Sequence, residues 1–327
     1  MSDRRDAAWW LVGVVLGLVE LGCAGPPQRT PAPADSRQPV PSLSAAAPGE
    51  APARLGPVPA SPPAVQRAAL EELPATASPA IIPAAAAQPP AAPPPADPQA
   101  RLREMYRLAA ERYDTIDSYI ARMRRREQVN GKDRPEELLL FKFRKEPWSV
   151  YFKVLGPEGK GREVVYVKGQ YGNQIHTLLA AGDMPLAPAG KRMALAPDSL
   201  FVRAASRHSI TEAGIGDIIR RFGRLLDALE KGDTHFGTVR YLGPVKRPEY
   251  EAPLEAAEVT LPPGLDAALP RGGKRLVMFD PASRLPVLVI TQDDTGHEVE
   301  YYCYDRLESP VRLDADDFNP DKLWPAR

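Results

Sequence analysis

The chain has 327 residues, with 42 basic and 42 acidic side chains and therefore no formal net charge. This balance excludes a nucleic-acid-binding chain, because such proteins need a basic surface. Two cysteines are too few for a disulfide framework or a thiolate-rich zinc site. The four histidines lack metal-ligand spacing, and no phosphate-loop, dinucleotide-binding or hydrolase motif occurs. We expect no nucleic-acid partner, no metal, no cofactor and no enzymatic activity.

The amino terminus has the composition of an export signal. Arg4 and Arg5 precede an uncharged apolar run over residues 7–19. This run is shorter than the roughly 20 apolar residues of a membrane span and fits the apolar region of a signal peptide. It ends at Gly22-Cys23, which resembles the processing site of bacterial lipoproteins, where the cysteine receives a diacylglycerol.

Residues 1–23 are therefore interpreted as a signal peptide, with Cys23 as the site of lipid attachment. Glu20 departs from the lipoprotein pattern, which usually has an aliphatic residue at that position. Cleavage after Ala24 by an ordinary signal peptidase and an uncleaved anchor stay open as alternatives. Each alternative exports the rest of the chain, and we expect a membrane-anchored protein of the cell envelope, at the outer membrane or in the periplasm.

Residues 24–98 are dominated by proline and alanine. Twenty-one of the 38 prolines lie between residues 26 and 100, a stretch without Phe, Trp or Tyr. Such a segment buries too little apolar surface to offset its chain entropy, so we predict a disordered linker. Proline-rich linkers are semi-rigid spacers, which would hold a domain away from a membrane. The globular domain is expected over residues 99–327.

Two helices are predicted in this domain. Asp97 as N-cap and Pro98 in the first turn predict a helix over 99–113, where apolar residues recur every three or four positions. A second helix runs from about 215 to 231, with Gly232 as its stop. Its strong apolar face needs a hydrophobic surface, and the concave side of a sheet is the expected place.

The other segments predict an antiparallel sheet. From Ser118, apolar residues alternate with Arg122, Arg124 and Arg126. A strand divides the whole basic cluster Arg122–Arg126 between its two faces. The following connections are too short for parallel crossovers, whereas residues 182–199 predict a longer irregular connection. The later strands are expected at 137–145, 149–155, 162–168, 173–180, 234–242, 254–261, 274–280, 285–292 and 298–305.

About ten strands and two long helices predict an α+β fold. The expected architecture is an incomplete, strongly curved antiparallel β-barrel whose concave side is covered by helices. The disordered Pro/Ala-rich tether precedes it.

The carboxy-terminal third resembles the end of LolA/LolB-type carriers, which sort outer-membrane lipoproteins. The resemblance rests on a strand ending at Asp280, on Leu285-Pro286, on a turn at 294–296, on a following Glu/Tyr-rich strand and on Asp317-Phe318. In those proteins an incomplete antiparallel barrel wraps a lipid-binding cavity, and helices form its lid. This chain departs from them by its long Pro/Ala-rich tether.

The upstream part is similar to the bacterial family called domain of unknown function 1571 (DUF1571). Together the two resemblances cover about residues 99–320. The matching segments are Tyr113-Asp114, Ser118-Tyr119, 145–148, Val150-Tyr151, 161–164 and Tyr166.

The resemblance implies a non-catalytic envelope lipoprotein that binds a lipid or a lipoprotein acyl chain, as a carrier or a receptor. The alternative is a surface-anchored structural or protein-interaction module with a dry core. A hydrolase is less favoured, because no acid and no nucleophile elbow accompany His208 and its neighbours Ser206 and Ser209. The candidates for an apolar cavity lining, for which ordinary core packing is the alternative, are Trp148, Tyr151, Phe152, Val165, Val167, Ile218, Phe222, Leu225, Val287, Val289 and Tyr301.

Two further groups of residues attract a functional interpretation. Cys303 lies on a predicted strand without a basic neighbour in the sequence, which favours a buried structural thiol over a nucleophile. The acidic residues at 293–294 and 314–317 lack the spaced ligands of a calcium loop. We expect them to form turns and caps.

Overall fold

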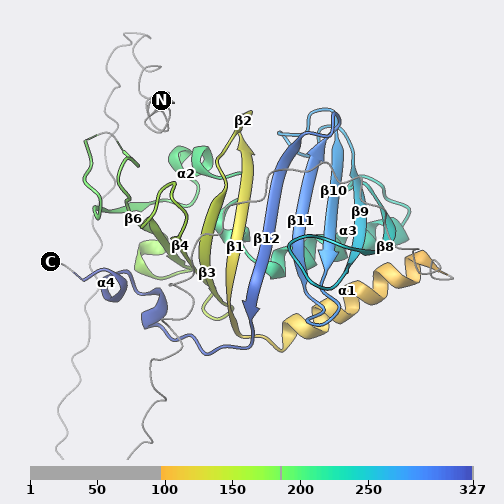
Figure 1. Ribbon diagram of the computed structural model, residues 1–327, viewed down its shortest axis with the longest axis horizontal. Coiled ribbons are helices and arrows are strands. Elements are labelled where there is room, and N and C mark those ends of the chain that lie inside the picture. The colour runs from red at the N-terminus through yellow and green to blue at the C-terminus, as the bar shows by residue number, and fades with distance from the viewer. Residues whose placement is uncertain (1–96, 185, 326–327) are drawn as a thin grey trace, which may run out of the picture.

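The computed structural model describes residues 97–184 and 186–325 (Figure 1). The predicted signal peptide, Cys23 and almost all of the predicted linker lie outside the described residues. The described part is one open antiparallel sheet of twelve strands, with two long helices on one side. This confirms the predicted fold class. Within these ranges no helix is long and apolar enough to cross a membrane.

Four α-helices, three single-turn 3-10 helices and twelve strands make up the described part of the fold. The α-helices are α1 (Pro98–Asp114), α2 (Leu200–Ala205), α3 (Ile215–Glu230) and α4 (Pro320–Leu323), and the 3-10 helices span Tyr171–Asn173, Ile210–Glu212 and Asp316–Phe318. The strands are β1 (Ser118–Val129), β2 (Lys132–Asp133), β3 (Glu137–Arg144), β4 (Ser149–Val154), β5 (Glu163–Val167), β6 (Ile175–Leu178), β7 (Arg192–Leu195), β8 (Thr238–Val245), β9 (Leu254–Leu261), β10 (Gly273–Phe279), β11 (Pro286–Asp293) and β12 (Glu298–Glu308).

The first and the last long strand lie side by side at the centre of the sheet. The strand order is β7-β6-β5-β4-β3-β1-β12-β11-β10-β9-β8, and β2 pairs only with β1. The chain therefore builds one half of the sheet with β1 to β7 and the other half with β8 to β12. Among the described residues, β7 and β8 are the edges and do not pair with each other, so the barrel stays open.

Helix α1 begins as the sequence predicts. The Asp97 side chain accepts hydrogen bonds from the backbone N–H groups of Gln99 and Ala100, at 2.9 and 3.1 Å. These bonds satisfy two of the donors that a helix start leaves without a partner. The buried stripe of α1 consists of Leu102, Met105 and Ala109.

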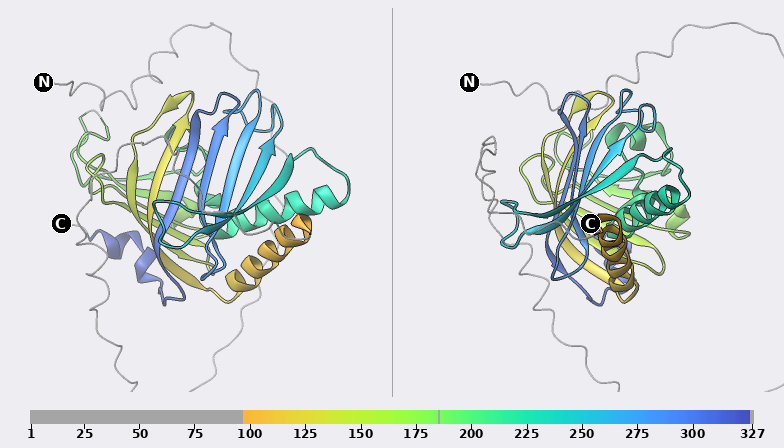
Figure 2. Two further views of the ribbon diagram at one scale, coloured as in Figure 1. Left: turned by 45° about the vertical axis from the view of Figure 1, so that its right-hand side comes forward. Right: turned by 90° about the vertical axis from the view of Figure 1, so that its right-hand side faces the viewer.

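Helix α3 lies against the concave side of the sheet, with α1 beside it (Figure 2). The Phe222 ring of α3 packs 5.4 Å from the Phe279 ring of β10. At the start of α3, the backbone N–H of Ile215 donates to the hydroxyl of buried Tyr119 on β1, at 3.0 Å. The amphipathic face predicted for this helix therefore finds the surface that it requires.

Two glycines of α3 let α1 approach closely. A Cβ atom at Gly223 would lie 2.5 Å from the ring of Tyr106 on α1, and one at Gly216 would lie 2.4 Å from the ring of Tyr113. Real side-chain contacts are not that short, so these two rings occupy the space that any larger residue needs. The pairing of α1 with α3 depends on these small residues.

A smaller apolar cluster lies on the opposite, convex face of the sheet. The carboxy-terminal segment crosses β4 and β5 there and covers them with Phe318 and Trp324. The residues of the sheet in this cluster are Leu140, Tyr151, Val165 and Val167.

Several predicted element boundaries differ from the structure, and two of the differences have an identifiable cause. The stretch 182–199 contains the edge strand β7, which was missed because it has only four residues, none of them buried. Strand β8 begins at Thr238 and not at residue 234. The cause is Gly237, which adopts φ 104° and in which a Cβ would collide with the carbonyl of Thr260 at 2.1 Å. Gly237 thus ends the preceding turn in a left-handed conformation, at a point where its backbone lies too close to Thr260 for a side chain.

We predict that Gly223→Ala destabilises the protein although alanine is the better helix former. Overpacking against Tyr106 is expected to cost about 1–3 kcal/mol, more than the roughly 1 kcal/mol that alanine contributes in a helix. In a Tyr106→Ala background the same change should become stabilising, because only the helix propensity remains. Urea unfolding of the four variants measures this sign reversal, and Arg224→Ala on the exposed side of α3 serves as the control. A Gly223→Ala effect of the same sign in both backgrounds would contradict this packing.

Candidate functional site

A cavity of about 1550 Å³ lies between the concave face of the sheet and the segment from α2 to α3. Strands from both halves of the sheet contribute to its wall. One part of this wall, the apolar floor, consists of Met123, Leu139, Phe141, Phe152, Val154, Val277 and Val289, and α3 faces it with Ile218, Phe222 and Leu225.

The other part of the wall, which we call the polar end, carries charged side chains. On β1, β3 and β10 they occupy positions two or four residues along from the floor that face the same cavity, and β12 contributes one more. They are Arg125 and Glu127 of β1, Glu137 of β3, Arg275 of β10 and Glu300 of β12.

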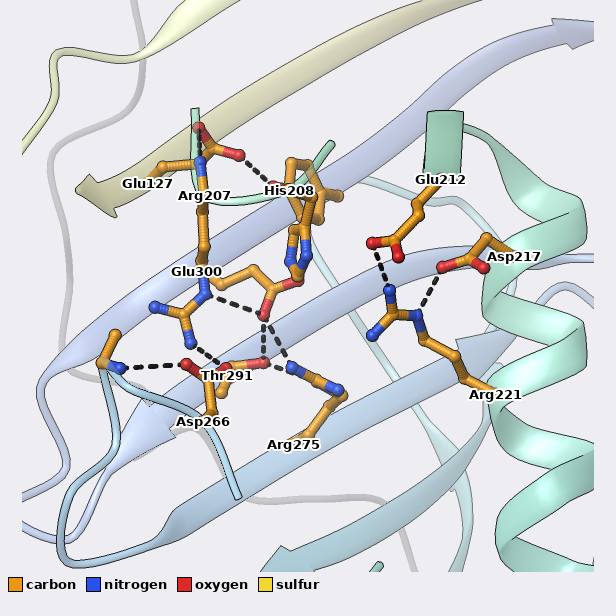
Figure 3. Close-up of polar contacts among 12 residues, drawn as sticks. Glu127, Arg207, His208, Glu212, Asp217, Arg221, Asp266, Arg275, Thr291 and Glu300 are labelled. Carbon is orange, nitrogen blue, oxygen red and sulfur yellow. Dashed lines mark hydrogen bonds and ion pairs between the residues drawn. The ribbon is translucent and has the colours of Figure 1, made fainter. Parts of the chain in front are cut away.

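Glu300 is the centre of the polar end (Figure 3). Its side chain is only 5 % exposed, and its oxygens accept hydrogen bonds from Thr291 at 2.8 Å and from Arg275 at 3.0 Å. The ring Nε2 of His208 lies 3.0 Å from the other oxygen. Burial by itself would raise the pKa of Glu300, but Arg275, His208 and Arg207 outweigh burial and hold it well below the ordinary value. Glu300 is therefore a buried carboxylate ion.

Residues 206–209, which we call the strap, cross the concave face between α2 and α3 and are pinned to the polar end (Figure 3). Glu127 accepts hydrogen bonds from the Ser206 hydroxyl and from the backbone N–H of Arg207, both at 3.3 Å. The Arg207 guanidinium pairs with Asp266 at 2.5 Å and lies 3.8 Å from Glu300. Each of the first three residues of the strap thus contacts a carboxylate.

The strap compensates an electrostatic repulsion between two carboxylates of the sheet. Glu127 and Glu300 are direct cross-strand partners of β1 and β12, and both are buried. Like charges directly opposite each other destabilise a pair of strands. The cationic and hydrogen-bonding groups of the strap lie over these two carboxylates, so the strap and the sheet neutralise each other.

A second ion-pair chain continues the polar end toward β5. Arg125 donates to Glu137, whose other oxygen accepts from Arg162 at 3.3 Å, and Arg162 also binds Asp183. Burial would raise the pKa of Glu137, but Arg125 and then Arg162 lower it below the ordinary value. Glu137 is therefore also ionised in the folded protein.

Apolar side chains surround the mouth of the cavity. Leu200 and Phe201 of α2 are 69 % and 47 % exposed, and both line the cavity. Phe236 and Leu265 are also exposed and line it from the loops that precede β8 and follow β9. A group of exposed large apolar residues at one opening is typical of an interaction site.

The structure brings five of the predicted lining residues to the cavity and places six elsewhere. Phe152, Ile218, Phe222, Leu225 and Val289 line it. The other six lie outside its lining: Tyr151, Val165 and Val167 in the convex cluster, Trp148 against the rings of Phe143 and Tyr166, Val287 in the main core, and Tyr301 beneath the guanidinium of Arg126.

The alternation of side chains explains most of these positions. Phe152 and its cross-strand partner Val164 line the cavity, so their neighbours Tyr151 and Val165 face the convex side. Apolar residues occupy both faces of these strands, so hydrophobicity alone does not distinguish the two.

Sequence reasoning missed the charged residues of the site. The predicted division of the β1 arginines is confirmed: Arg122 and Arg124 pair with Asp305, whereas Arg125 faces the cavity. The alternation along β1 therefore contained a signal for Arg125. Nothing in the sequence pairs Glu300 with the strap, because these residues are about ninety positions apart.

The other residues singled out from the sequence have structural environments. Cys303 is buried, and burial raises the pKa of its thiol above the ordinary value. Asp293 and Asp314 accept hydrogen bonds from backbone N–H groups of their own turns. Within residues 97–184 and 186–325 no group of three potential ligands is arranged to hold a metal ion.

The fold and the site define an open antiparallel barrel with a large, partly charged cavity on its concave side. The chain belongs to the family described as protein of unknown function (DUF1571), whose model matches residues 116–323, more than half of the chain. No curated protein matches it.

Several solved structures are similar in fold at low sequence identity. The lipoprotein LppX of Mycobacterium tuberculosis is 12% identical with a TM-score of 0.39, and the match covers 66% of this chain and 99% of that chain. A LolA superfamily protein from Nitrosomonas europaea is 14% identical, with a TM-score of 0.29 and coverages of 68% and 99%. An uncharacterized conserved protein from Thermus thermophilus is 9% identical, with a TM-score of 0.38 and coverages of 67% and 92%. This likeness concerns the fold alone.

We predict that Glu300→Gln lowers the free energy of unfolding at pH 7 by about 3–5 kcal/mol, because it removes the buried countercharge of Arg275 and Arg207. The folded-state pKa of Glu300 is lowered, so its contribution to stability is present above the ordinary value of 4.5 and is lost as the pH falls below it. The variant should therefore lose less stability on acidification than the parent. Urea unfolding from pH 7 to about pH 3 measures both effects.

The exposed Glu111 of α1 provides the control, and Glu111→Gln should leave the unfolding free energy nearly unchanged. A Glu300→Gln protein as stable as the parent at pH 7 would contradict the role given to this carboxylate.

Proposed function

We propose that this protein binds the acyl chain of a lipid or lipoprotein in its cavity, as a carrier or receptor of the cell envelope, without catalysis. The observation that carries the proposal is a cavity of about 1550 Å³ whose lining includes many apolar side chains of the sheet and of α3. Pockets for small molecules usually measure about 300–1,000 Å³, so this cavity has room for a longer ligand. Its volume argues against the alternative of an interaction module with a dry core.

The apolar floor supplies the driving force for such a ligand. Each methylene that moves from water into apolar surroundings contributes about 0.8 kcal/mol. Phe152, which is partly exposed, offers an aromatic surface to a chain lying between sheet and helix, and its ring stacks on that of the fully buried Phe141 with centroids 4.9 Å apart. An acyl chain needs no directed hydrogen bonds, which fits a wall of this composition.

The mouth supports the same function. Leu200, Phe201, Phe236 and Leu265 line the cavity and are at the same time exposed. They offer apolar contacts to an acyl chain where the cavity meets the surface. Exposed groups of this kind are uncommon where no ligand or partner binds.

The contacts of the strap favour a binding role over a hydrolase. The Ser206 hydroxyl donates to Glu127, and His208 pairs with Glu300, so the serine and the histidine are held by different carboxylates. A nucleophilic serine needs a general base within hydrogen-bond reach. Ser206 is instead bound to a carboxylate that already accepts from the Arg207 backbone.

Filling part of the cavity should weaken ligand binding without unfolding the protein. Val164 of β5 lines the cavity and is only partly buried, so Val164→Trp places its ring into open space. We expect binding of the neutral fluorophore N-phenyl-1-naphthylamine to weaken at least tenfold, about 1.4 kcal/mol, with an unchanged urea midpoint. Thr260→Trp, at an exposed position of β9 outside the cavity lining, is the matched control. Absence of fluorophore binding by the parent protein would contradict the proposal.

Membrane attachment through Cys23 is part of this proposal, although that residue lies outside the described part of the chain. It is supported by the apolar run that ends at Gly22-Cys23. We predict that Cys23→Ser abolishes incorporation of labelled palmitate and moves the protein from the membrane fraction to the soluble one. Absence of label in the parent would favour cleavage after Ala24 or an uncleaved anchor.

A further inference from the structure

The side chains on the concave face of the sheet change from apolar to charged along the strands. On β1 the residues facing the cavity run from Met123 to Arg125 and Glu127, and on β10 from Val277 back to Arg275. The antiparallel register brings the charged positions together, because Arg125 pairs with Glu137 and Glu127 pairs with Glu300. The cavity is therefore amphipathic, with an apolar floor beside a polar end. A ligand that matches both parts has a tail and a head.

The carboxylates of the polar end are already occupied. Glu300 accepts hydrogen bonds at both oxygens, from Thr291 and Arg275 at one and from His208 at the other. Both oxygens of Glu137 are also engaged, one by Arg125 and one by Arg162. Both oxygens of Glu127 accept as well. These three carboxylates hold no oxygen without a donor.

The guanidinium groups of the same wall keep free donors. Arg125 uses Nε and Nη2 on Glu137, and Arg275 uses Nε on Thr291 and Nη2 on Glu300. Within the described part of the chain, neither Nη1 group donates a hydrogen bond, and neither is among the atoms sealed from solvent without a partner. Both arginines line the cavity and are 21 % and 18 % exposed. Each offers two N–H bonds to a ligand.

We propose that the ligand is an amphiphile with an anionic head group, a carboxylate or a phosphate, whose oxygens bind the free Nη1 of Arg125 while its alkyl chain lies on the apolar floor. This inference rests on the proposed function. Guanidinium groups suit both kinds of anion, because their planar N–H donors match oxygens that share one charge. Arg125 is then the residue that determines head-group specificity, whereas Arg275 lies three strands away and points toward Glu300.

The hydrogen bonds that the polar end already makes also disfavour other head groups. A cationic head at this position would meet the Arg125 guanidinium, whose countercharge Glu137 already accepts hydrogen bonds at both oxygens. A neutral hydroxyl would accept only one or two of the available hydrogen bonds and carry no charge. Hydrogen bonds to charged groups are stronger than those between neutral groups, so these classes should differ by tenfold or more in affinity.

Four amphiphiles with one common alkyl chain test the preference on the full chain. They are hexadecanoate, hexadecyl phosphate, hexadecanol and hexadecyltrimethylammonium, each used below its critical micelle concentration to displace N-phenyl-1-naphthylamine. The two anions should bind at least tenfold more tightly than hexadecanol, and the cation should bind most weakly. Which anion binds more tightly distinguishes a fatty-acid-like head from a phospholipid-like head.

Two arginines of β1 form a matched pair of variants. In Arg125→Gln, Glu137 keeps Arg162 at 3.3 Å. In Arg122→Gln, on the face away from the cavity, Asp305 keeps Arg124 at 3.6 Å. Arg125→Gln should weaken both anions about tenfold and leave hexadecanol within twofold, whereas Arg122→Gln should leave all four unchanged.

The outcomes separate this inference from the function on which it rests. Failure of the parent to bind the fluorophore and all four amphiphiles would overturn both. Binding of anions and hexadecanol with equal affinity would overturn the head-group inference and leave acyl binding standing. Equal effects of Arg125→Gln on the anions and on hexadecanol would also overturn it. The comparison of head groups on the parent decides the question even where a variant folds poorly.

Discussion

A sheet of this width cannot be covered by one helix, and the cavity follows from that constraint. Eleven strands lie in one row, and at about 4.8 Å between neighbours they span on the order of 50 Å before curvature. The 16 residues of α3 form a helix of about 24 Å. Helix α1 packs beside α3 through Gly216 and Gly223 and does not extend this cover over β3 to β7. The uncovered part of the concave face is closed by the short α2 and the strap.

This uncovered part is held open by charge. Apolar residues alone would draw α2 and the strap onto the floor and close the space. The strap is fixed instead to the polar end, where Glu127 and Glu300 lie opposite each other, Arg207 and Arg275 supply positive charge, and His208 is hydrogen-bonded to Glu300. Buried carboxylates of this kind stabilise the structure only while every partner is present. The position of the strap is thus determined by ion pairs and hydrogen bonds to the sheet.

The sequence predicted the architecture better than the site. The change from a helical spacing to a period of two at Ser118, and the cap at Asp97, located α1 and β1 correctly because both signals are local. The four-residue β7 was missed, since it is exposed at the edge of the sheet and has no apolar pattern. The faces of β4 and β5 were not distinguishable, because the carboxy-terminal segment covers the convex side with its own apolar residues. The strap and its partner Glu300 are brought together only by the tertiary fold.

Native mass spectrometry of the full chain, purified in detergent-free buffer, measures whether an amphiphile is bound in the cavity. We expect a population of the protein with added mass. Organic extraction should release the bound molecule, which should have an alkyl chain and an acidic head. After extraction, the protein should regain one equivalent of hexadecanoate or hexadecyl phosphate. A protein that carries no added mass on purification and gains none from either compound would contradict the binding of an amphiphile in the cavity.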